Sequence, residues 1–524
     1  MSYFTSLKRF LLFSFSPLLF GNILFGAEYF VSPEGDDSNS GSLEFPFATL
    51  QRGQEAVEPG DTVFIRGGTY RVQESQIARY ESIWAYVNYL DKSGEEGAPI
   101  NYFAYPGETP VFDYSDIAPA DLRITAFFVK GSWIHLKGIE LVGIQVTILD
   151  HTQSIGIENQ GSHNIFEQVD VHDGQAIGFY LTRGSDNLLL NCDAYRNWDY
   201  TSENGKGGNV DGFGGHLRAG GTNNVFRGCR AWFNSDDGFD AINSNEAVVF
   251  ENCWAFYNGY SSEFASLADG NGFKSGGHAG TAVDRLPDPL PRHVTRFCLA
   301  VGNKASGFYA NHQIGGQEWF NNTAIGNTYN FNMLARLEDN ATDVDGYGGV
   351  MRNNLGYGAS LSSREVVNLN EEESDVSGNY FTLEVEVTAD DFVSLDESLL
   401  TMPRQPNGDL PDIAYARLVK DSDLIDSGLD AGYAFSGSAP DLGAFEHDTD
   451  KSPFEIALIL QPDVQQVRVS GPLGWPYSLV AANDPRLEAE DWGTVDSGPV
   501  EQDGNRYAEV DIDGARFFRL KYSQ

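Results

Sequence analysis

The sequence predicts an all-β solenoid, a fold in which short strands stack coil upon coil. An eleven-residue phrase recurs as NLLLNCDAYRN, NVFRGCRAWFN, VVFENCWAFYN and HVTRFCLAVGN. These phrases begin at residues 187, 224, 248 and 293, and related phrases begin at 164 and 317, which gives a basic period of 23–24 residues with two insertions. Apolar and polar residues alternate at period two, which disfavours helical repeats. The 57 glycines among 524 residues, about 11% where ~7% is usual, favour many tight turns.

The composition excludes some classes of partner. There are 34 Lys and Arg residues against 75 Asp and Glu, which gives a formal net charge of −41. A surface this acidic repels phosphate backbones, so we expect no nucleic acid partner. Hydrophobic residues make up 41% of the chain, enough for a large core, so this is not a disordered acidic protein.

The N-terminal residues predict export. Lys8 and Arg9 precede an apolar run over residues 10–25, and Gly26-Ala27 follows it, which is the layout of a secretory signal over residues 1–27. An uncleaved anchor helix is the alternative. Since no later apolar stretch is long enough to span a bilayer, we expect a secreted protein, and a monomer. The next element, over residues 46–57, fits a short helix that caps the N-terminal end of the solenoid.

Two ladders of identical residues follow from the repeated phrase. Equivalent positions in neighbouring coils stack at the strand spacing of ~4.8 Å. Each phrase ends in Asn, which predicts a ladder of amides that bond to turn backbone. All the cysteines share one position in the phrase, and residues at the same position of adjacent coils pair poorly as disulfides. We therefore expect buried free thiols, with disulfides as the alternative, at Cys192, Cys229, Cys253 and Cys298.

A Gly-Phe pair recurs between those strands and marks the candidate site. The Phe residues, at positions 179, 213, 239, 273 and 308, are expected in the core, and the residue after each Phe points outward. Asp240 and Lys274 thereby occupy the same outward position in successive coils. Asp211, Asp237 and Asn271 stand just before the Gly, again in register, so a bend at the Gly is required.

The acidic residues around this pair predict a calcium site. Asp211, Asp236, Asp237 and Asp240 fall within two neighbouring coils, so four carboxylates lie close together. Such a cluster repels itself unless a hard cation binds, and ligands that are all oxygen favour Ca²⁺. The alternative is that the segment NSDDGFD is a solvated acidic turn.

Lys274 is the candidate base. Nearby calcium and partial burial both favour the neutral amine, which brings its pKa toward working pH. A cation that binds a uronate carboxylate acidifies the adjacent carbon-bound proton, and loss of that proton leads to β-elimination of the glycosidic bond. The alternative is a surface lysine or a structural ion pair with Asp240.

At these residues the chain resembles polysaccharide lyase family nine. The segments NVDGF, NSDDGFD and GNGFKSGG occur in the family's order, and VSPEGDDSNSGSLEFPFATL is similar to its N-terminal cap. The resemblance covers roughly residues 28–450, with its specific part at 209–277. It implies a right-handed parallel β-helix over residues 28–446, calcium bound by the four aspartates, and Lys274 as the base.

The resemblance leaves the substrate open between pectate, also called polygalacturonate, and rhamnogalacturonan, because the family includes lyases of both. Two other classes are weighed against it. One is a non-catalytic β-helix that binds glycans, such as an adhesin. The other is a glycosidase, which needs a pair of acids and leaves Lys274 unexplained. Residues 447–453 fit a linker, and alternating segments over residues 454–524 predict a small β-sandwich-like module.

Overall fold

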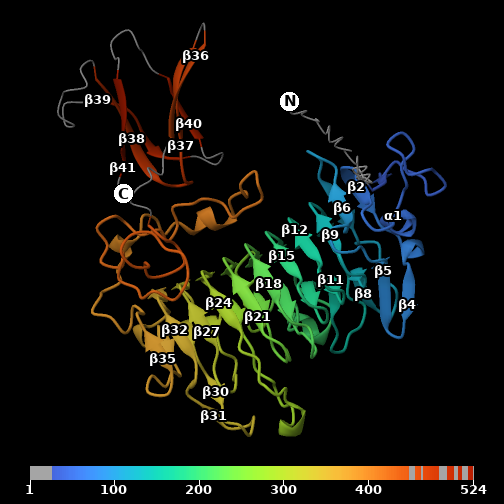
Figure 1. The fold of residues 1–524 in the computed structure, drawn as a ribbon, viewed down its shortest axis with the longest axis horizontal. Coiled ribbons are helices and arrows are strands. Elements are labelled where there is room, and N and C mark those ends of the chain that lie inside the picture. The colour runs from blue at the N-terminus through green and yellow to red at the C-terminus, as the bar shows by residue number, and fades with distance from the viewer. Residues whose placement is uncertain are drawn as a thin grey trace, which may run out of the picture.

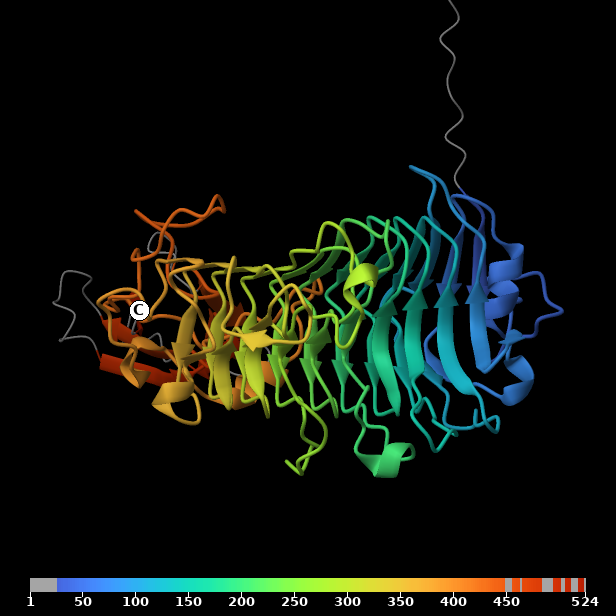
Figure 2. The same ribbon diagram turned by 90° about the horizontal axis from the view of Figure 1, so that it is seen from below.

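The protein is a parallel β-helix, as the repeated phrase predicts. The computed structural model describes residues 26–447 and, beyond them, 455–461, 464–482, 493–500, 505–509 and 517–522. Three long sheets run along the molecule, and each coil contributes one short strand to each sheet (Figures 1 and 2). The expected secretory signal lies almost wholly outside the described residues. The domain limits at residues 27 and 446 stay predictions.

The first two sheets form two walls of the coils. Sheet A is parallel throughout and consists of β1 (Glu28–Val31), β2 (Thr62–Ile65), β6 (Ile100–Ala104), β9 (Ile134–Lys137), β12 (Ile165–Glu167), β15 (Leu188–Leu190), β18 (Asn224–Arg227), β21 (Val248–Glu251), β24 (Val294–Arg296), β27 (Glu318–Phe320), β32 (Val350–Arg352) and β35 (Asp375–Ser377). Sheet B consists of β3 (Gly68–Arg71), β7 (Pro110–Asp113), β10 (Glu140–Val142), β13 (Asp170–His172), β16 (Asp193–Tyr195), β19 (Arg230–Trp232), β22 (Trp254–Phe256), β25 (Leu299–Val301), β28 (Thr323–Ile325) and β33 (Leu355–Tyr357).

Sheet C carries the Gly-Phe pairs. It consists of β5 (Trp84–Leu90), β8 (Arg123–Val129), β11 (Ser154–Asn159), β14 (Ala176–Leu181), β17 (Phe213–Gly215), β20 (Phe239–Asp240), β23 (Phe273–Lys274), β26 (Ser306–Tyr309), β29 (Tyr329–Asn332) and β34 (Val366–Val367), with β4 (Arg79–Glu81) antiparallel at its edge. The Phe side chains stack inside the coils from Phe179 to Phe331, with ring centroids 4.7–5.2 Å apart. This aromatic ladder fixes the register of the outward residues on the same strands.

The two predicted polar ladders are present in the core. The Asn197 side chain donates to Asn234, which donates to Asn258 and so on to Asn327, with N–O distances of 3.0–3.1 Å. Because the amides also donate to backbone carbonyls, the buried turns are satisfied. All four cysteines are buried and free, which confirms that prediction.

Short helices close the ends and loops. The capping helix α1 (Leu50–Ala56) begins where the Thr49 hydroxyl accepts a bond from the Arg52 N–H, and it buries Leu50 against the first coil. The remaining helical elements are single turns, namely η1 (Glu74–Gln76), η2 (Glu203–Gly205), η3 (Val283–Arg285), η4 (Ser362–Arg364), η5 (Ala389–Asp391) and η6 (Glu397–Thr401). A small hairpin pairs β30 (Ala335–Arg336) with β31 (Asp343–Val344). Within the described part of the chain, no helix combines the length and apolarity that a membrane crossing needs.

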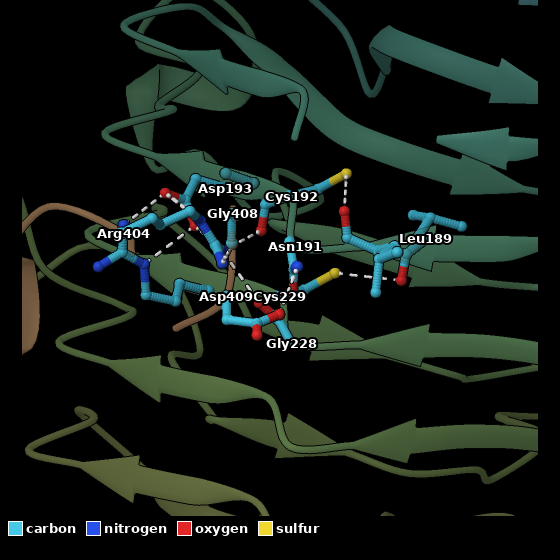
Figure 3. A network of polar contacts seen from close by, with 12 residues as sticks. Leu189, Asn191, Cys192, Asp193, Gly228, Cys229, Arg404, Gly408 and Asp409 are labelled. Carbon is cyan, nitrogen blue, oxygen red and sulfur yellow. Dashed lines mark hydrogen bonds and ion pairs between the residues drawn. The ribbon is translucent and has the colours of Figure 1, made fainter. Parts of the chain in front are cut away.

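After the last strand of sheet A, residues 378–447 fold back over the outer face of sheet B. Leu399 and Leu400 pack there in one apolar cluster with Trp254. Arg404 is held against β16 by Asp193, with N–O distances of 2.5 and 3.3 Å, and by the carbonyls of Cys192 and Gly228 (Figure 3). In Figure 1 this segment (orange) lies between the coils and the C-terminal module (red).

The C-terminal module is β-rich, as predicted. It consists of two three-stranded antiparallel sheets, β36 (Glu455–Gln461), β37 (Val464–Ser470) and β40 (Asn505–Glu509) in one, and β38 (Pro476–Ala482), β39 (Gly493–Pro499) and β41 (Phe517–Tyr522) in the other. Leu473 of this module bridges to Ile413 of the fold-back segment.

Candidate active site and metal centre

The candidate residues lie on the outer face of sheet C. We call the outer row the residues that directly follow the stacked Phe in each strand and their partners in register, namely Tyr89, Phe128, Glu158, Tyr180, Gly214, Asp240, Lys274, Tyr309 and Asn332. Asp240 of β20 and Lys274 of β23 are direct neighbours in this row. Because Phe239 and Phe273 point inward, these two side chains point outward.

A second row, one residue before each Gly, supplies the other carboxylates. Asp211 Oδ1 accepts the Asp237 N–H at 3.2 Å, Asp237 Oδ1 accepts the Asn271 N–H at 2.6 Å, and Asn271 Oδ1 accepts the Ser306 N–H at 3.1 Å. The Asn271 amide also donates to Asp237 Oδ1, at 2.8 Å. Each side chain therefore uses one oxygen to hold the next coil, and the second oxygens of Asp211 and Asp237 remain for the site.

Two loops hold the Asp236 side chain in place, one leading into β17 and the other into β23. Its Oδ2 accepts the Asn209 N–H at 2.8 Å, and its Oδ1 accepts the Asp269 N–H at 3.0 Å. Asn209 has a φ of 89°, a conformation that a non-glycine residue rarely adopts. The loop of η2, which leads to Asn209, stands out below the coils in Figure 2. The two insertions that carry Asn209 and Asp269 thus position the Asp236 carboxylate.

The four carboxylates are buried and mutually repelling. The exposed fractions are 3% for Asp211, 8% for Asp236, 0% for Asp237 and 4% for Asp240. Burial, and then the charges of its neighbours, raises the pKa of Asp211 well above its usual range. Burial and the nearby Asp237 raise the pKa of Asp236 to about 7. Burial and the charge of Asp240 raise the pKa of Asp237, against the attraction of Lys274.

Lys274 is the cationic side chain that faces this cluster. Its Nζ lies 2.9 Å from Asp237 Oδ2 and 3.2 Å from Asp240 Oδ2, and its side chain is 12% exposed. Burial lowers the pKa of Lys274, but the attraction of Asp237 and Asp240, followed by Asp211 and Asp236, raises it well above its usual value. This attraction opposes the lowering that the sequence predicts from burial and calcium, and it includes the ion pair with Asp240 that stood as the alternative.

The donor set fits a hard divalent cation. Oxygens of Asp211, Asp236 and Asp237 lie within 4.8 Å of one another. One lysine cannot neutralise four buried carboxylates, and burying unpaired charge is costly. Carboxylate oxygens are the ligands that Ca²⁺ prefers. These residues can therefore hold Ca²⁺, and Asp237 and Asp240 are the two that contact Lys274.

His216, which the sequence places near the candidate groove as a structural or substrate-contact histidine without metal-ligand spacing, lies among the carboxylates. A ring nitrogen of His216 lies within 4.8 Å of oxygens of both Asp211 and Asp240. Its Nε2 is buried and makes no hydrogen bond to the protein. Burial lowers the pKa of His216, so the ring is neutral. The sequence position of His216, two residues after Gly214 of the outer row, could have indicated this placement, because alternation along a strand returns that side chain to the same face.

A buried lysine and a carboxylate cluster on the outer face of one sheet of a parallel β-helix define a class, the β-helical polysaccharide lyases. The family model described as "Pel9A-like, right handed beta helix region" matches residues 29–354. The chain belongs to this family, polysaccharide lyase family nine. Residues 370–449, which include the fold-back segment, match a second model, "Rhamnogalacturonan lyase-like, C-terminal".

Individual relatives agree with this assignment. A pectate lyase L of Dickeya dadantii is 36% identical over 427 residues, which cover 80% of this chain and 90% of the relative. A solved rhamnogalacturonan lyase is 46% identical, with a TM-score of 0.73, over 76% of this chain and 97% of that one. The crystal structure of pectate lyase Pel9A is 33% identical, with a TM-score of 0.64, over 82% of this chain and 98% of that one. The protein is a polysaccharide lyase, and its β-helix is right-handed.

Proposed function

We propose that this enzyme is a secreted, calcium-dependent lyase that cleaves a uronic-acid-containing polymer by β-elimination, with Lys274 as the base. The observation that carries this proposal is the placement of Lys274 Nζ, 2.9 Å from Asp237 and 3.2 Å from Asp240, in a cluster of four buried carboxylates. A non-catalytic glycan-binding protein has no need of such a self-repelling cluster beside a buried amine.

Four aspartates, Asp211, Asp236, Asp237 and Asp240, would hold Ca²⁺. When bound, the cation supplies positive charge that neutralises these carboxylates and acidifies the proton beside a uronate carboxylate. With the carboxylates neutralised, burial becomes the main influence on Lys274, and burial lowers the pKa of an amine. Lys274 is then able to accept a proton at working pH.

The elimination breaks a C–H bond and a C–O bond of the substrate and forms one C–C double bond. Lys274 Nζ takes the proton from C5 of the uronate, the electron pair forms the C4–C5 double bond, and the bond from C4 to the glycosidic oxygen breaks. The departing oxygen takes a proton from solvent. Lys274 also lies beside Tyr309 in the outer row, and burial raises the pKa of that phenol to about 12, so Tyr309 stays neutral next to the reacting sugar.

We infer that rhamnogalacturonan is the first substrate to test. The solved rhamnogalacturonan lyase is 46% identical to this chain, against 33% for Pel9A, and the second family model is that of a rhamnogalacturonan lyase C-terminal region. Polygalacturonate is the second candidate, supported by the 36% identity to pectate lyase L over 427 residues.

The test is a panel of both polymers with added calcium, followed by the ultraviolet absorbance of unsaturated sugar ends. We expect the absorbance to rise with rhamnogalacturonan, to stop on addition of a chelator and to resume when calcium is restored. Full activity in excess chelator, with calcium removal verified, would contradict the proposed mechanism. No rise with any acidic polymer would contradict the proposed substrate class. Export is tested separately, by N-terminal sequencing of protein secreted from a host cell.

A further inference from the structure

The metal-binding atoms on the outer face of sheet C form two sets. The first set is Asp211, Asp236 and Asp237, whose carboxylate oxygens lie within 4.8 Å of one another. The second set consists of Asp211, Asp240 and a ring nitrogen of His216, which meet the same distance limit. Both sets contain Asp211, and two-metal sites hold their ions ~3.5–4 Å apart, close enough for one carboxylate to bridge them. We call the second set the histidine set.

His216 is placed so that it can act as a metal ligand. Its ring packs against Tyr180, with centroids 4.9 Å apart, and this contact orients the imidazole. Gly214 makes the contact possible, because a Cβ atom there would lie 2.7 Å from Tyr180 Cδ2 and 3.1 Å from His216 Cδ2. His216 Nε2 is buried and makes no hydrogen bond to any described residue. A neutral imidazole is the commonest side-chain ligand of metals in proteins.

Asp240 has a carboxylate oxygen available at the same place. Its Oδ1 accepts the Ile242 N–H at 2.7 Å, and its Oδ2 lies 3.2 Å from Lys274 Nζ. Lys274 is the only partner of this Oδ2 among the described residues, and Lys274 also pairs with Asp237 at 2.9 Å. A cation in the histidine set would therefore compete with Lys274 for Asp240.

The charge of the cluster favours two cations over one. Four buried carboxylates carry four negative charges when ionised, and one divalent cation neutralises two of them. In the proposed mechanism Lys274 is neutral and a uronate adds a further negative charge, so three charges would be left uncompensated. Unpaired charge in a buried site is costly. A second divalent cation leaves a single negative charge and gives the carboxylate of the uronate a partner.

We propose that Asp211, His216 and Asp240 form a second cation site, next to the calcium ion, that takes a divalent transition metal such as Mn²⁺. An imidazole in the donor set suits such a metal better than Ca²⁺, whose ligands are oxygens. The four aspartates would then hold two cations, and the second would weaken the ion pair between Asp240 and Lys274. The role of this site rests on the proposed function, whereas its existence is measured without turnover.

The test counts the metal ions and identifies their ligands. Wild-type protein is kept in a large excess of Ca²⁺, which fills the first set, and is titrated calorimetrically with Mn²⁺. We expect one Mn²⁺ to bind per chain while calcium stays bound, as metal analysis after gel filtration would show. Pulsed electron paramagnetic resonance of the bound Mn²⁺ should detect coupling to a ring nitrogen.

Two variants make the result specific. His216→Phe keeps an aromatic ring against Tyr180 and removes the nitrogen ligand. It should weaken Mn²⁺ binding by at least ~10–100-fold, the range for loss of a residue that only supports a ligand, and should abolish the nitrogen coupling. Calcium binding should be unchanged, because the first set lacks His216. The matched control is His312→Phe, at a histidine whose Nδ1 lies 2.9 Å from Asp343 Oδ1, and it should behave as wild type.

Two outcomes would overturn the inference. One is that no Mn²⁺ binds beside calcium, which would mean that protons compensate the remaining carboxylates. The other is that Mn²⁺ binds without nitrogen coupling and equally well to His216→Phe. If His216→Phe failed to fold and lost calcium too, the nitrogen coupling in the wild type would still decide. Absence of turnover on both polymers with both cations present would instead overturn the proposed function, and the metal count would stand.

Discussion

Two buried clusters of charged side chains, on different faces of the β-helix, differ in how their charge is balanced. On sheet B, Asp193 faces Arg230, with N–O distances of 2.6 and 3.0 Å, and also Arg404. Burial alone would raise the pKa of Asp193, but the two guanidinium groups hold it below its usual value. On sheet C, four carboxylates share one lysine, and the pKa of Asp236 rises to about 7.

The difference distinguishes a structural contact from a binding site. On sheet B, Asp193 itself is satisfied by two guanidinium groups, although burial and the charge of Asp193 raise the pKa of the adjacent Asp170 to about 7. The Asp193 contacts fasten the fold-back segment, because Arg230 also donates to the carbonyl of Met402 at 2.9 Å. The sheet C cluster is not satisfied by the protein, so it has binding capacity left for a cation. Four changes test this contrast, from the largest expected effect to the smallest.

Removal of the proposed base should have the largest effect. Lys274→Ala and Lys274→Arg should each lower turnover by ~10²–10⁴-fold, because neither residue accepts a proton at working pH. Calcium affinity should stay the same or rise in Lys274→Ala, since a repelling charge is gone. Turnover is measured by ultraviolet absorbance and calcium binding by calorimetry. The control is Lys206→Ala. If Lys206→Ala lost turnover and Lys274→Ala kept it, the base would lie elsewhere.

Breaking the balanced cluster should affect stability and leave calcium binding intact. Asp193→Ala leaves two buried guanidinium groups without their carboxylate partner, and loss of one partner of a buried pair costs about 3–5 kcal/mol. Chemical denaturation measures this change. Arg71→Ala is the matched control, because Arg71 is 71% exposed and pairs with Asp113 at 3.5 Å, and such pairs contribute about 0–1 kcal/mol. Equal losses from the two variants would mean that sheet B does not fasten the segment.

In calcium-free protein, removal of one sheet C carboxylate should not lower the free energy of unfolding, in contrast to the removal of Asp193. In protein stripped by a chelator, Asp237→Asn should be no less stable than wild type, because repulsion is relieved and the Asn271 N–H keeps an acceptor. With calcium at a hundred times the wild-type Kd, the wild type gains about 2.7 kcal/mol and the variant should gain far less. Thermal unfolding with and without calcium checks both statements. Asp339→Asn, a change at an exposed turn, should behave as wild type.

The smallest effect expected, counted for a single pH unit, is on pH dependence. The pKa of Asp236 is about 7 in the folded chain, above its usual value of 3.8, so the folded protein binds a proton that the unfolded chain has released. Stability without calcium therefore falls as pH rises from about 4 to about 7, by up to ~1.4 kcal/mol per pH unit for this group. Calcium needs the ionised carboxylate, so its stabilising effect should grow over the same range. A calcium-dependent rise in Tm that shrinks toward neutral pH would contradict this.

Much of the site could be predicted from the sequence because one coil adds one strand to each sheet. Phe239 and Phe273 stack in that register, so Asp240 and Lys274 had to become neighbours on the outer face. The Asn and Cys ladders follow from the same repeat. The elements that break the repeat could not be placed in this way. The insertion that carries Asn209 gives no periodic signal, yet its N–H fixes Asp236.

By itself, the sequence determined the solenoid, its register and the placement of the four aspartates and Lys274 in neighbouring coils, because these depend on local periodicity. Only the tertiary structure decided how charge is balanced. It brought Arg404 to Asp193 across 211 residues and brought His216 to Asp211 and Asp240. It also buried the carboxylates so deeply that they hold Lys274 protonated. Charge balance depends on distance and burial together, and both are set by loops and a returning segment whose paths no repeat encodes.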